Sequence, residues 1–155
     1  MGEAGVGDVR PRILLIDDDE RICETLTGVL EEQGYKVDSA LTGGDAIRKS
    51  IRQYYNMALI DIRLPDIDGT KLIERLEENN PGIVKIIITG YPSLENAVES
   101  LNKGADGYII KPFRMDELLE TVRRHLKRQE EAQSLSEEKV TEYIKARIKK
   151  LTTEG

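Results

Sequence analysis

Four short apolar runs in this sequence each end in residues whose side chains can bind a cation or a phosphoryl group. Such runs, bounded by turn residues, are typical of buried parallel strands. Ligands of open parallel sheets bind outside the carboxyl ends of the strands. The four runs are followed, in chain order, by Asp17 and Asp18, Asp61, Thr89 and Lys111. We therefore expect these acids, the hydroxyl and the amine to form one site.

The three acids predict a site for a divalent cation. Clustered carboxylates raise one another's pKa unless they share a cation, and their hard oxygens suit Mg²⁺, for which Mn²⁺ can substitute. We expect Asp18 and Asp61 to be direct ligands and Asp17 to act through water. The backbone carbonyl of Arg63 is a further candidate ligand.

The same set of residues predicts phosphoryl transfer to Asp61, which would keep one oxygen free to attack phosphorus and form an acyl phosphate. Such a transfer needs mainly positioning and neutralisation of the equatorial oxygens. The cation, the Lys111 ammonium and the Thr89 hydroxyl would each bind one of them. Each residue also has a structural alternative: a turn or helix cap for an aspartate, a β-branched strand position for Thr89, and a solvated surface position for Lys111.

Strand patterns alternate with helical patterns along residues 10–128. This alternation predicts an α/β fold with a parallel sheet. Right-handed crossovers would give a doubly wound, flavodoxin-like sheet of five strands in the order 2-1-3-4-5, with helices on both faces. Helical periodicity assigns several apolar side chains to inward faces, among them Ile51, Leu94, Val98 and Leu101.

The two ends of the chain fall outside this alternating unit. Residues 1–9 predict a mobile N-terminal tail without the apolar core of a signal peptide. Residues 129–155 predict a linker and an amphipathic C-terminal helix, with a capping box at 134–137. That helix could pack on its own domain, bind a partner or a second copy, or lead into an output domain. Its apolar residues recur at helical spacing: Val140, Tyr143, Ile144, Ile148 and Leu151.

Composition narrows the class of protein. The chain has 155 residues, a formal net charge of −6 and one cysteine, so no internal disulfide can form. No apolar run approaches the ~20 residues that cross a bilayer. These features favour the cytoplasm and no membrane partner, and the acidic body argues against direct nucleic-acid binding.

The motifs resemble the receiver domain of two-component response regulators of the chemotaxis-regulator type. The resemblance covers residues 10–128 and is carried by Asp17-Asp18, Asp61 with Pro65 and Gly69, Thr89-Gly90, and Gly104 through Lys111-Pro112. It implies that Asp61 accepts a phosphoryl group from a sensor histidine kinase. It also implies that Asp17 and Asp18 bind the metal, that Thr89 and Lys111 sense the phosphate, and that the protein is a switch rather than an enzyme.

The resemblance further implies how such a switch would work. Phosphorylation would draw Thr89 toward the phosphate and let Tyr108 turn inward. The surface formed by the helix at Leu94, the strand at Tyr108 and the helix at Leu118 would then change, controlling a downstream protein or self-association.

Two further positions follow from the family pattern. Arg63 and Tyr91 stand two residues after Asp61 and Thr89, where family members border the route of the hydrolysing water. We expect these two residues to set the phosphoryl lifetime.

One segment resembles a different class. Residues 66–70, Asp-Ile-Asp-Gly-Thr, match the signature of Mg²⁺-dependent phosphatases of the haloacid-dehalogenase type, which also use a phosphoaspartate. That signature should directly follow an apolar strand, but here Leu64-Pro65 precedes it. The chain is also too short for the cap and further core strands of such an enzyme.

Overall fold

Five strands alternate with five helices in the computed structural model, which describes residues 9–154. The strands are β1 (Arg12–Ile16), β2 (Lys36–Ala40), β3 (Met57–Asp61), β4 (Val84–Thr89) and β5 (Gly107–Ile110). The helices are α1 (Glu20–Glu32), α2 (Gly43–Arg52), α3 (Gly69–Asn79), α4 (Leu94–Asn102) and α5 (Met115–Glu154). The mobile tail expected at residues 1–9 lies outside the described residues, apart from Val9.

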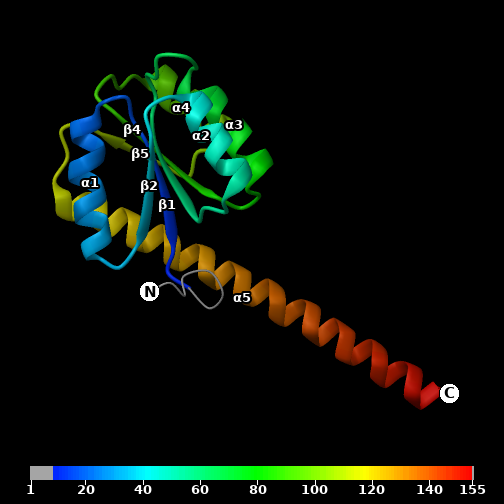
Figure 1. Ribbon diagram of the computed structural model, residues 1–155. Coiled ribbons are helices and arrows are strands. Elements are labelled where there is room, and N and C mark those ends of the chain that lie inside the picture. The colour runs from blue at the N-terminus through cyan, green and yellow to red at the C-terminus, as the bar shows by residue number, and fades with distance from the viewer. Residues whose placement is uncertain (1–8, 155) are drawn as a thin grey trace.

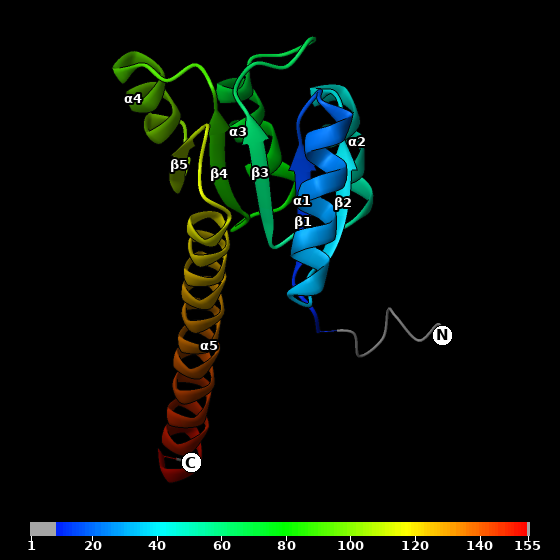
Figure 2. The same cartoon turned by 90° about the vertical axis from the view of Figure 1, so that its left-hand side faces the viewer.

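The strands form one parallel sheet in the order β2-β1-β3-β4-β5, which confirms the predicted topology. Helices α1 and α5 cover one face, and α2 and α3 cover the other (Figures 1 and 2). Both faces of the sheet are therefore covered, which explains why the inner strands β1, β3 and β4 are near-continuous apolar runs. Within the described residues, no helix has the length and apolarity to cross a membrane.

The central strand β3 shows how the core is divided. Leu59 packs in the cluster on the α1 and α5 side, whereas Ala58 and Ile60 pack on the α2 and α3 side. Successive side chains of a strand point to opposite faces, so both layers depend on the register of β3. The last residue of this strand is Asp61, which therefore lies at the carboxyl edge of the sheet.

Four helices begin at this same edge with a side-chain cap. Asp19, Thr42, Asp68 and Ser93 each accept a hydrogen bond from a backbone N–H in the first turn of α1, α2, α3 and α4. These caps satisfy N–H groups that have no partner within the helix. They also fix where the chain turns after each strand, which sets the positions of the site residues.

Several residues expected to face the core are exposed, and these expectations were wrong. Ile51 is 68% exposed because it lies near the end of α2, to one side of the face that buries Ala46 and Ser50. In α4, which lies beside the edge of the sheet, Ser100 is the buried residue. The apolar side chains of α4 face solvent instead: Leu94, Val98 and Leu101.

The expected linker at residues 129–133 is also wrong, because α5 continues without a break to Glu154. The segment contains glutamine, glutamate and alanine, which favour helices, and neither glycine nor proline. Ser134 therefore lies inside a helix rather than capping a new one. The amphipathic C-terminal helix exists as the projecting half of α5, which leaves the domain in Figures 1 and 2.

Gln129 holds α5 at the point where it leaves the domain. Its Nε2 donates to the carbonyl oxygens of Asn56 at 2.8 Å and of Gly82 at 2.9 Å. Both carbonyls lie in loops that precede strands, β3 and β4, so the side chain ties the helix to the end of the sheet opposite Asp61. Gln129 is thus an anchor of the helix rather than part of a linker.

Candidate functional site

Three carboxylates meet at the carboxyl edge of the sheet. Asp17 and Asp18 directly follow β1, and Asp61 ends the neighbouring strand β3. Oxygen atoms of the three carboxylates lie within 4.8 Å of one another. Asp17 is buried, Asp61 is partly buried and Asp18 is exposed, so the cluster opens to solvent on one side. This set of hard oxygen ligands, with an open side for water, fits a divalent cation such as Mg²⁺.

Lys111 supplies the positive charge within this cluster. Its Nζ lies 3.0 Å from Asp17 Oδ2 and 3.7 Å from Asp61 Oδ2. The residue directly follows β5, and its peptide bond to Pro112 is cis. Burial alone would lower the pKa of Lys111, but the hydrogen bond and charge of Asp17, followed by those of Asp61, raise it. The lysine is therefore a fixed cation that pairs with two of the three acids.

Asp61 lies where its negative charge is poorly stabilised. Burial raises its pKa, the Arg63 N–H that donates to Oδ1 at 3.0 Å lowers it, and the Asp17 charge raises it again. The net shift is upward despite the nearby lysine. A divalent cation among the carboxylates would relieve this unfavourable charge, which is a second reason why the residues fit one.

Thr89 ends β4, the strand next to β3. Asp61 pairs in register with Ile88, so Thr89 lies one residue further along the neighbouring strand. Its side chain is buried, and its Oγ1 accepts a hydrogen bond from the Tyr91 N–H at 3.0 Å. The Thr89 carbonyl accepts from the Lys111 N–H at 2.8 Å. The ends of β4 and β5 are therefore joined beside the acidic cluster.

Arg63 and Tyr91 contact each other, which the sequence did not reveal. The guanidinium carbon of Arg63 lies 3.8 Å from the centroid of the Tyr91 ring, a cation–π contact. The two residues come from the loops that follow Asp61 and Thr89. Their contact bridges these loops on the outer side of the candidate site.

Tyr108 of β5 packs its ring against the core cluster on the α2 and α3 side of the sheet. Its hydroxyl is buried and has no hydrogen-bond partner among the described residues. A buried hydroxyl without a hydrogen-bond partner costs free energy, so the hydroxyl destabilises this position of the ring.

The loop after Asp61 is held by two further acids. Asp66 accepts hydrogen bonds from the N–H groups of Gly43 at 2.8 Å and Gly44 at 2.9 Å, and the bond from Gly44, followed by that from Gly43, lowers its pKa. Asp68 caps α3 by accepting from the Thr70 N–H at 2.8 Å. Both carboxylates of the phosphatase-like segment therefore bind backbone amides. Sequence reasoning missed this role of Asp66, although the Gly-Gly pair at the start of α2 was a visible signal.

A comparison with protein families decides the class. The sequence model of the response regulator receiver domain matches residues 13–123. The chain belongs to this family. Receiver domains are phosphorylation-dependent signalling switches rather than metabolic enzymes, and they bind a divalent metal at acidic residues.

Curated relatives of this receiver domain include transcriptional regulators. It is 37% identical over 114 residues to the transcriptional regulatory protein ZraR of Salmonella typhimurium, an alignment covering 74% of this chain and 26% of the relative. It is 34% identical over 117 residues to CusR of Escherichia coli K12, covering 76% of this chain and 52% of CusR. The chain thus spans about a quarter to a half of the length of these relatives.

Solved structures give the same fold. A receiver domain protein from Methanospirillum hungatei has 46% identity and a TM-score of 0.77, covering 79% of this chain and 98% of that one. A response regulator from Burkholderia pseudomallei has 28% identity and a TM-score of 0.70, covering 81% of this chain and 74% of that one. The structure of the Burkholderia protein contains a phosphorylated aspartic acid and a calcium ion.

Proposed function

We propose that this receiver domain accepts one phosphoryl group on Asp61 from a sensor histidine kinase. We further propose that Asp17, Asp18 and Asp61 hold Mg²⁺, that the Arg63 carbonyl is a further ligand, and that Mn²⁺ can replace Mg²⁺. The observation that carries the proposal is the convergence of three carboxylates within 4.8 Å, with Lys111 paired to two of them. Membership of the response regulator family supports a sensor kinase as the phosphoryl donor.

In the proposed transfer, an oxygen of Asp61 attacks phosphorus and forms a phosphorus–oxygen bond, while the bond from phosphorus to the donor nitrogen breaks. A cation held by the three carboxylates would supply positive charge beside the transferred group. Lys111 Nζ, 3.7 Å from Asp61 Oδ2, is placed to bind a second phosphoryl oxygen. The Thr89 hydroxyl binds a third. Lys111 would exchange its bond to Asp17 for one to the phosphoryl group, so this positive charge is already beside the position that the phosphoryl group would take.

The switch proposal rests on Thr89 and Tyr108. The Thr89 hydroxyl now accepts a hydrogen bond from the Tyr91 N–H, and a phosphoryl group would draw it away from this donor. The loop between β4 and α4 would then shift, and the start of α4 would move with it. The Tyr108 ring can rotate in response, because its hydroxyl makes no hydrogen bond among the described residues that would oppose the rotation. The two residues lie on adjacent strands, with Thr89 paired to Ile110 two residues beyond Tyr108.

The output surface is proposed to be the α4-β5-α5 face. Leu94 of α4 is 81% exposed. Val98 and Leu101 of the same helix are also exposed, as is Ile110 of β5. Apolar side chains gathered on one face are typical of an interaction site. This face, or the projecting half of α5, would bind a downstream protein or a second copy. We expect neither nucleic acid nor a membrane as a direct partner, and we place the protein in the cytoplasm.

Arg63 and Tyr91 are proposed to control how long the phosphoryl group stays on Asp61. Their cation–π contact joins the two loops beside the site, so it can restrict the approach of water to phosphorus. A tighter contact between the loops would lengthen the phosphoryl lifetime.

The proposal is tested by intact-protein mass spectrometry after incubation with acetyl phosphate and Mg²⁺. We expect one phosphoryl group per chain, and none either when a chelator is present during the incubation or in Asp61→Asn. Asp116→Asn is the matched control, because Asp116 pairs with Arg114 at the exposed start of α5 and should label normally. Labelling of Asp61→Asn at the level of the unsubstituted protein would refute the assignment.

A further inference from the structure

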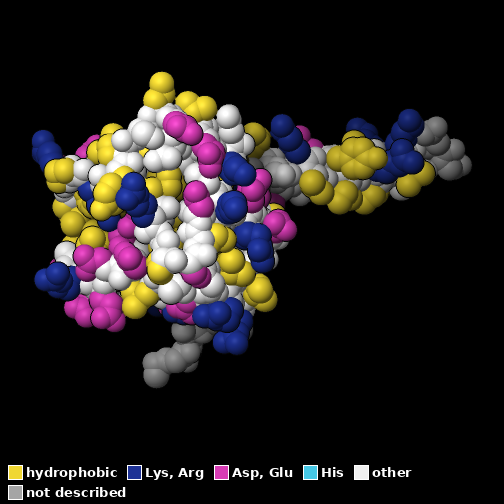
Figure 3. Space-filling view, turned by 90° about the horizontal axis from the view of Figure 1, so that it is seen from above, with side chains coloured by type: hydrophobic (Ala, Val, Ile, Leu, Met, Phe, Trp, Pro, Cys, Tyr) yellow, Lys and Arg dark blue, Asp and Glu magenta, His cyan; other side chains and the backbone are white. Residues whose placement is uncertain are grey.

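The projecting half of α5 carries an apolar stripe that the domain does not cover. All residues from 130 to 153 are exposed. Figure 3 shows hydrophobic side chains along this part of the molecule, with Lys and Arg near its far end. A stripe on one side of a solvated helix is typical of a helix that packs against a partner. Its members are Val140, Tyr143, Ile144, Ile148 and Leu151.

This stripe faces the same side of the helix as the residues that dock on the sheet. Val122 and Leu126 are buried against the domain, and Val140 and Ile144 follow each of them by 18 residues. A separation of 18 residues is about five turns, or about 27 Å along the axis. The apolar stripe of the projecting half therefore lies on the same side of α5 as the residues that pack against the domain, but beyond the edge of the domain.

This phase decides which way a second helix can run. A helix packed parallel to α5 along the stripe would continue into the space that the domain itself occupies beside Val122 and Leu126. An antiparallel helix from a second copy avoids this overlap, because its own domain then lies beyond the level of residue 154 and not beside Val122 and Leu126. The projecting half of α5 runs straight away from the sheet (Figures 1 and 2).

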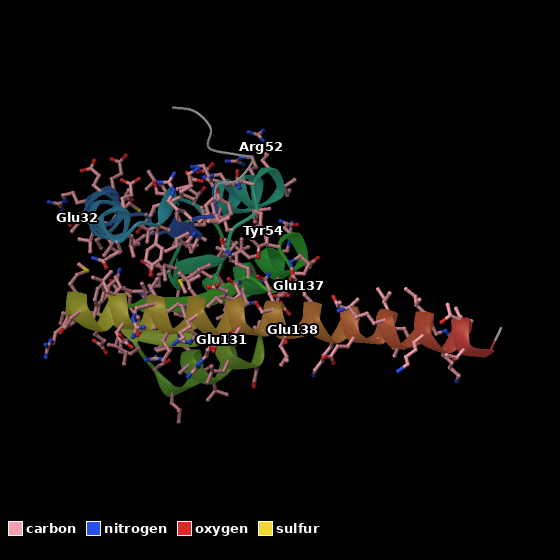
Figure 4. All side chains as sticks on the ribbon, turned by 90° about the horizontal axis from the view of Figure 1, so that it is seen from below. Glu32, Arg52, Tyr54, Glu131, Glu137 and Glu138 are labelled. Carbon is pink, nitrogen blue, oxygen red and sulfur yellow. The ribbon has the colours of Figure 1, made fainter. Side chains whose placement is uncertain are left out.

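Charge along the projecting half favours the same direction. Residues 129–138 contain four glutamates and no Lys or Arg, and residues 145–150 contain four Lys or Arg residues and no acid. Figure 4 labels three of these glutamates, Glu131, Glu137 and Glu138, on the part of α5 nearer the domain. An antiparallel pair places the acidic part of each helix against the basic part of the other. A parallel pair would place like charges together.

We propose that two copies of this chain associate through the projecting halves of α5, packed antiparallel about the level of Glu142. Val140 then packs against Ile144 of the second copy, and the acidic residues near Glu137 face Arg147 of the second copy. At this register the stripe residues that follow Ile144 lie opposite polar residues of the second copy, so apolar pairing is confined to the middle of the helix. The interface is therefore smaller than the about 800 Å² per partner of a standard specific interface. A reversible dimer follows. The inference builds on the proposed role of α5 in binding partners and is independent of phosphorylation.

Sedimentation velocity over a range of concentrations tests the association. We expect the full chain to form a reversible dimer and Ile144→Lys to raise the dissociation constant at least tenfold. Leu135→Lys is the matched control: Leu135 is also exposed, but it lies nine residues before Ile144, about half a turn out of phase, on the opposite side of the helix. A monomer at every concentration, or equal loss in both variants, overturns the proposal.

Spin labels test the direction of packing. The native Cys23 is buried, so Thr152→Cys introduces an accessible thiol near the tip of α5. Two labelled tips in an antiparallel pair centred at Glu142 lie about 30 Å apart along the axis, whereas parallel tips lie about 10 Å apart. The short distance overturns the antiparallel arrangement. Ile144→Lys should still take up one phosphoryl group, so failure of the dimer and failure of the phosphoacceptor are separate results.

Discussion

Replacing Lys111 with methionine should tighten the binding of Mg²⁺ to this receiver domain. The lysine competes with a cation for the carboxylates, because its Nζ lies 3.0 Å from Asp17 and 3.7 Å from Asp61. A unit charge about 5 Å from a divalent ion repels it by about 7 kcal/mol at an effective dielectric constant of about 20, and by about 2 kcal/mol in water. The Lys111 side chain is 23% exposed and Asp18 faces solvent, so we adopt a value near the lower figure, about 2 kcal/mol.

This value corresponds to roughly a 30-fold lower dissociation constant for Mg²⁺. Isothermal titration calorimetry at low ionic strength measures it directly. Lys103→Met is the matched control, because this substitution removes the same charge from a lysine that pairs with Glu74 away from the site. Unchanged or weaker Mg²⁺ binding in Lys111→Met would refute the reasoning. The same variant should accept phosphoryl groups more slowly, since Lys111 no longer neutralises the transferred group.

Four further substitutions test three separate features. Arg63→Ala and Tyr91→Ala should each shorten the phosphoryl half-life several-fold, and the double variant should add little, because each change alone breaks their shared contact; additive effects would contradict this. Tyr108→Phe should raise the free energy of unfolding by up to about 1 kcal/mol in urea, since it removes a buried hydroxyl without a partner; a loss of stability would contradict this. Glu77→Gln should lower that free energy by about 1 kcal/mol at neutral pH, because it removes the nearer of the two carboxylates that the buried Lys85 contacts. A difference that persists in acid would contradict this account.

The pH dependence of the Glu77 effect has a definite sign. Burial opposes ionisation of Glu77, but the hydrogen bonds from Lys85 and from the Gly82 N–H outweigh it and lower its pKa. A group with a lowered pKa in the folded state stabilises the fold above its unfolded pKa, about 4.5 for glutamate. The contribution is lost as pH falls through the folded pKa. The difference between Glu77→Gln and the unsubstituted protein should therefore disappear in acid, which urea titrations at a series of pH values measure.

The carboxyl edge of the sheet was predictable from sequence because one physical rule positions all of its residues. Buried parallel strands are apolar runs, and their carboxyl ends meet at one edge. Asp17, Asp18, Asp61 and Lys111 each follow such a run, so their convergence required no knowledge of packing between distant segments. The caps of α1 by Asp19 and of α2 by Thr42 are likewise local, because each side chain bonds to a backbone N–H two or three residues further along the chain.

The features that sequence reasoning missed depend on which surface covers an element. Periodicity shows that α4 has an apolar side, but not that this side faces solvent beside the last strand of the sheet, as Leu94 does. The anchor that Gln129 makes to the Asn56 and Gly82 carbonyls joins residues that are distant in sequence, so no local pattern predicts it. The contact between Arg63 and Tyr91 joins two loops whose paths no local pattern specifies.

The central claim is that these strand ends form a site that phosphorylates one particular carboxylate. It is tested most directly by phosphorylating the protein with acetyl phosphate and Mg²⁺ and then reducing it with borohydride. The reagent converts a phosphoaspartate to homoserine, whose position tandem mass spectrometry identifies. Homoserine should be found at position 61 and at no other aspartate. Homoserine at Asp66 or Asp68, with Asp61 unchanged, would contradict the account.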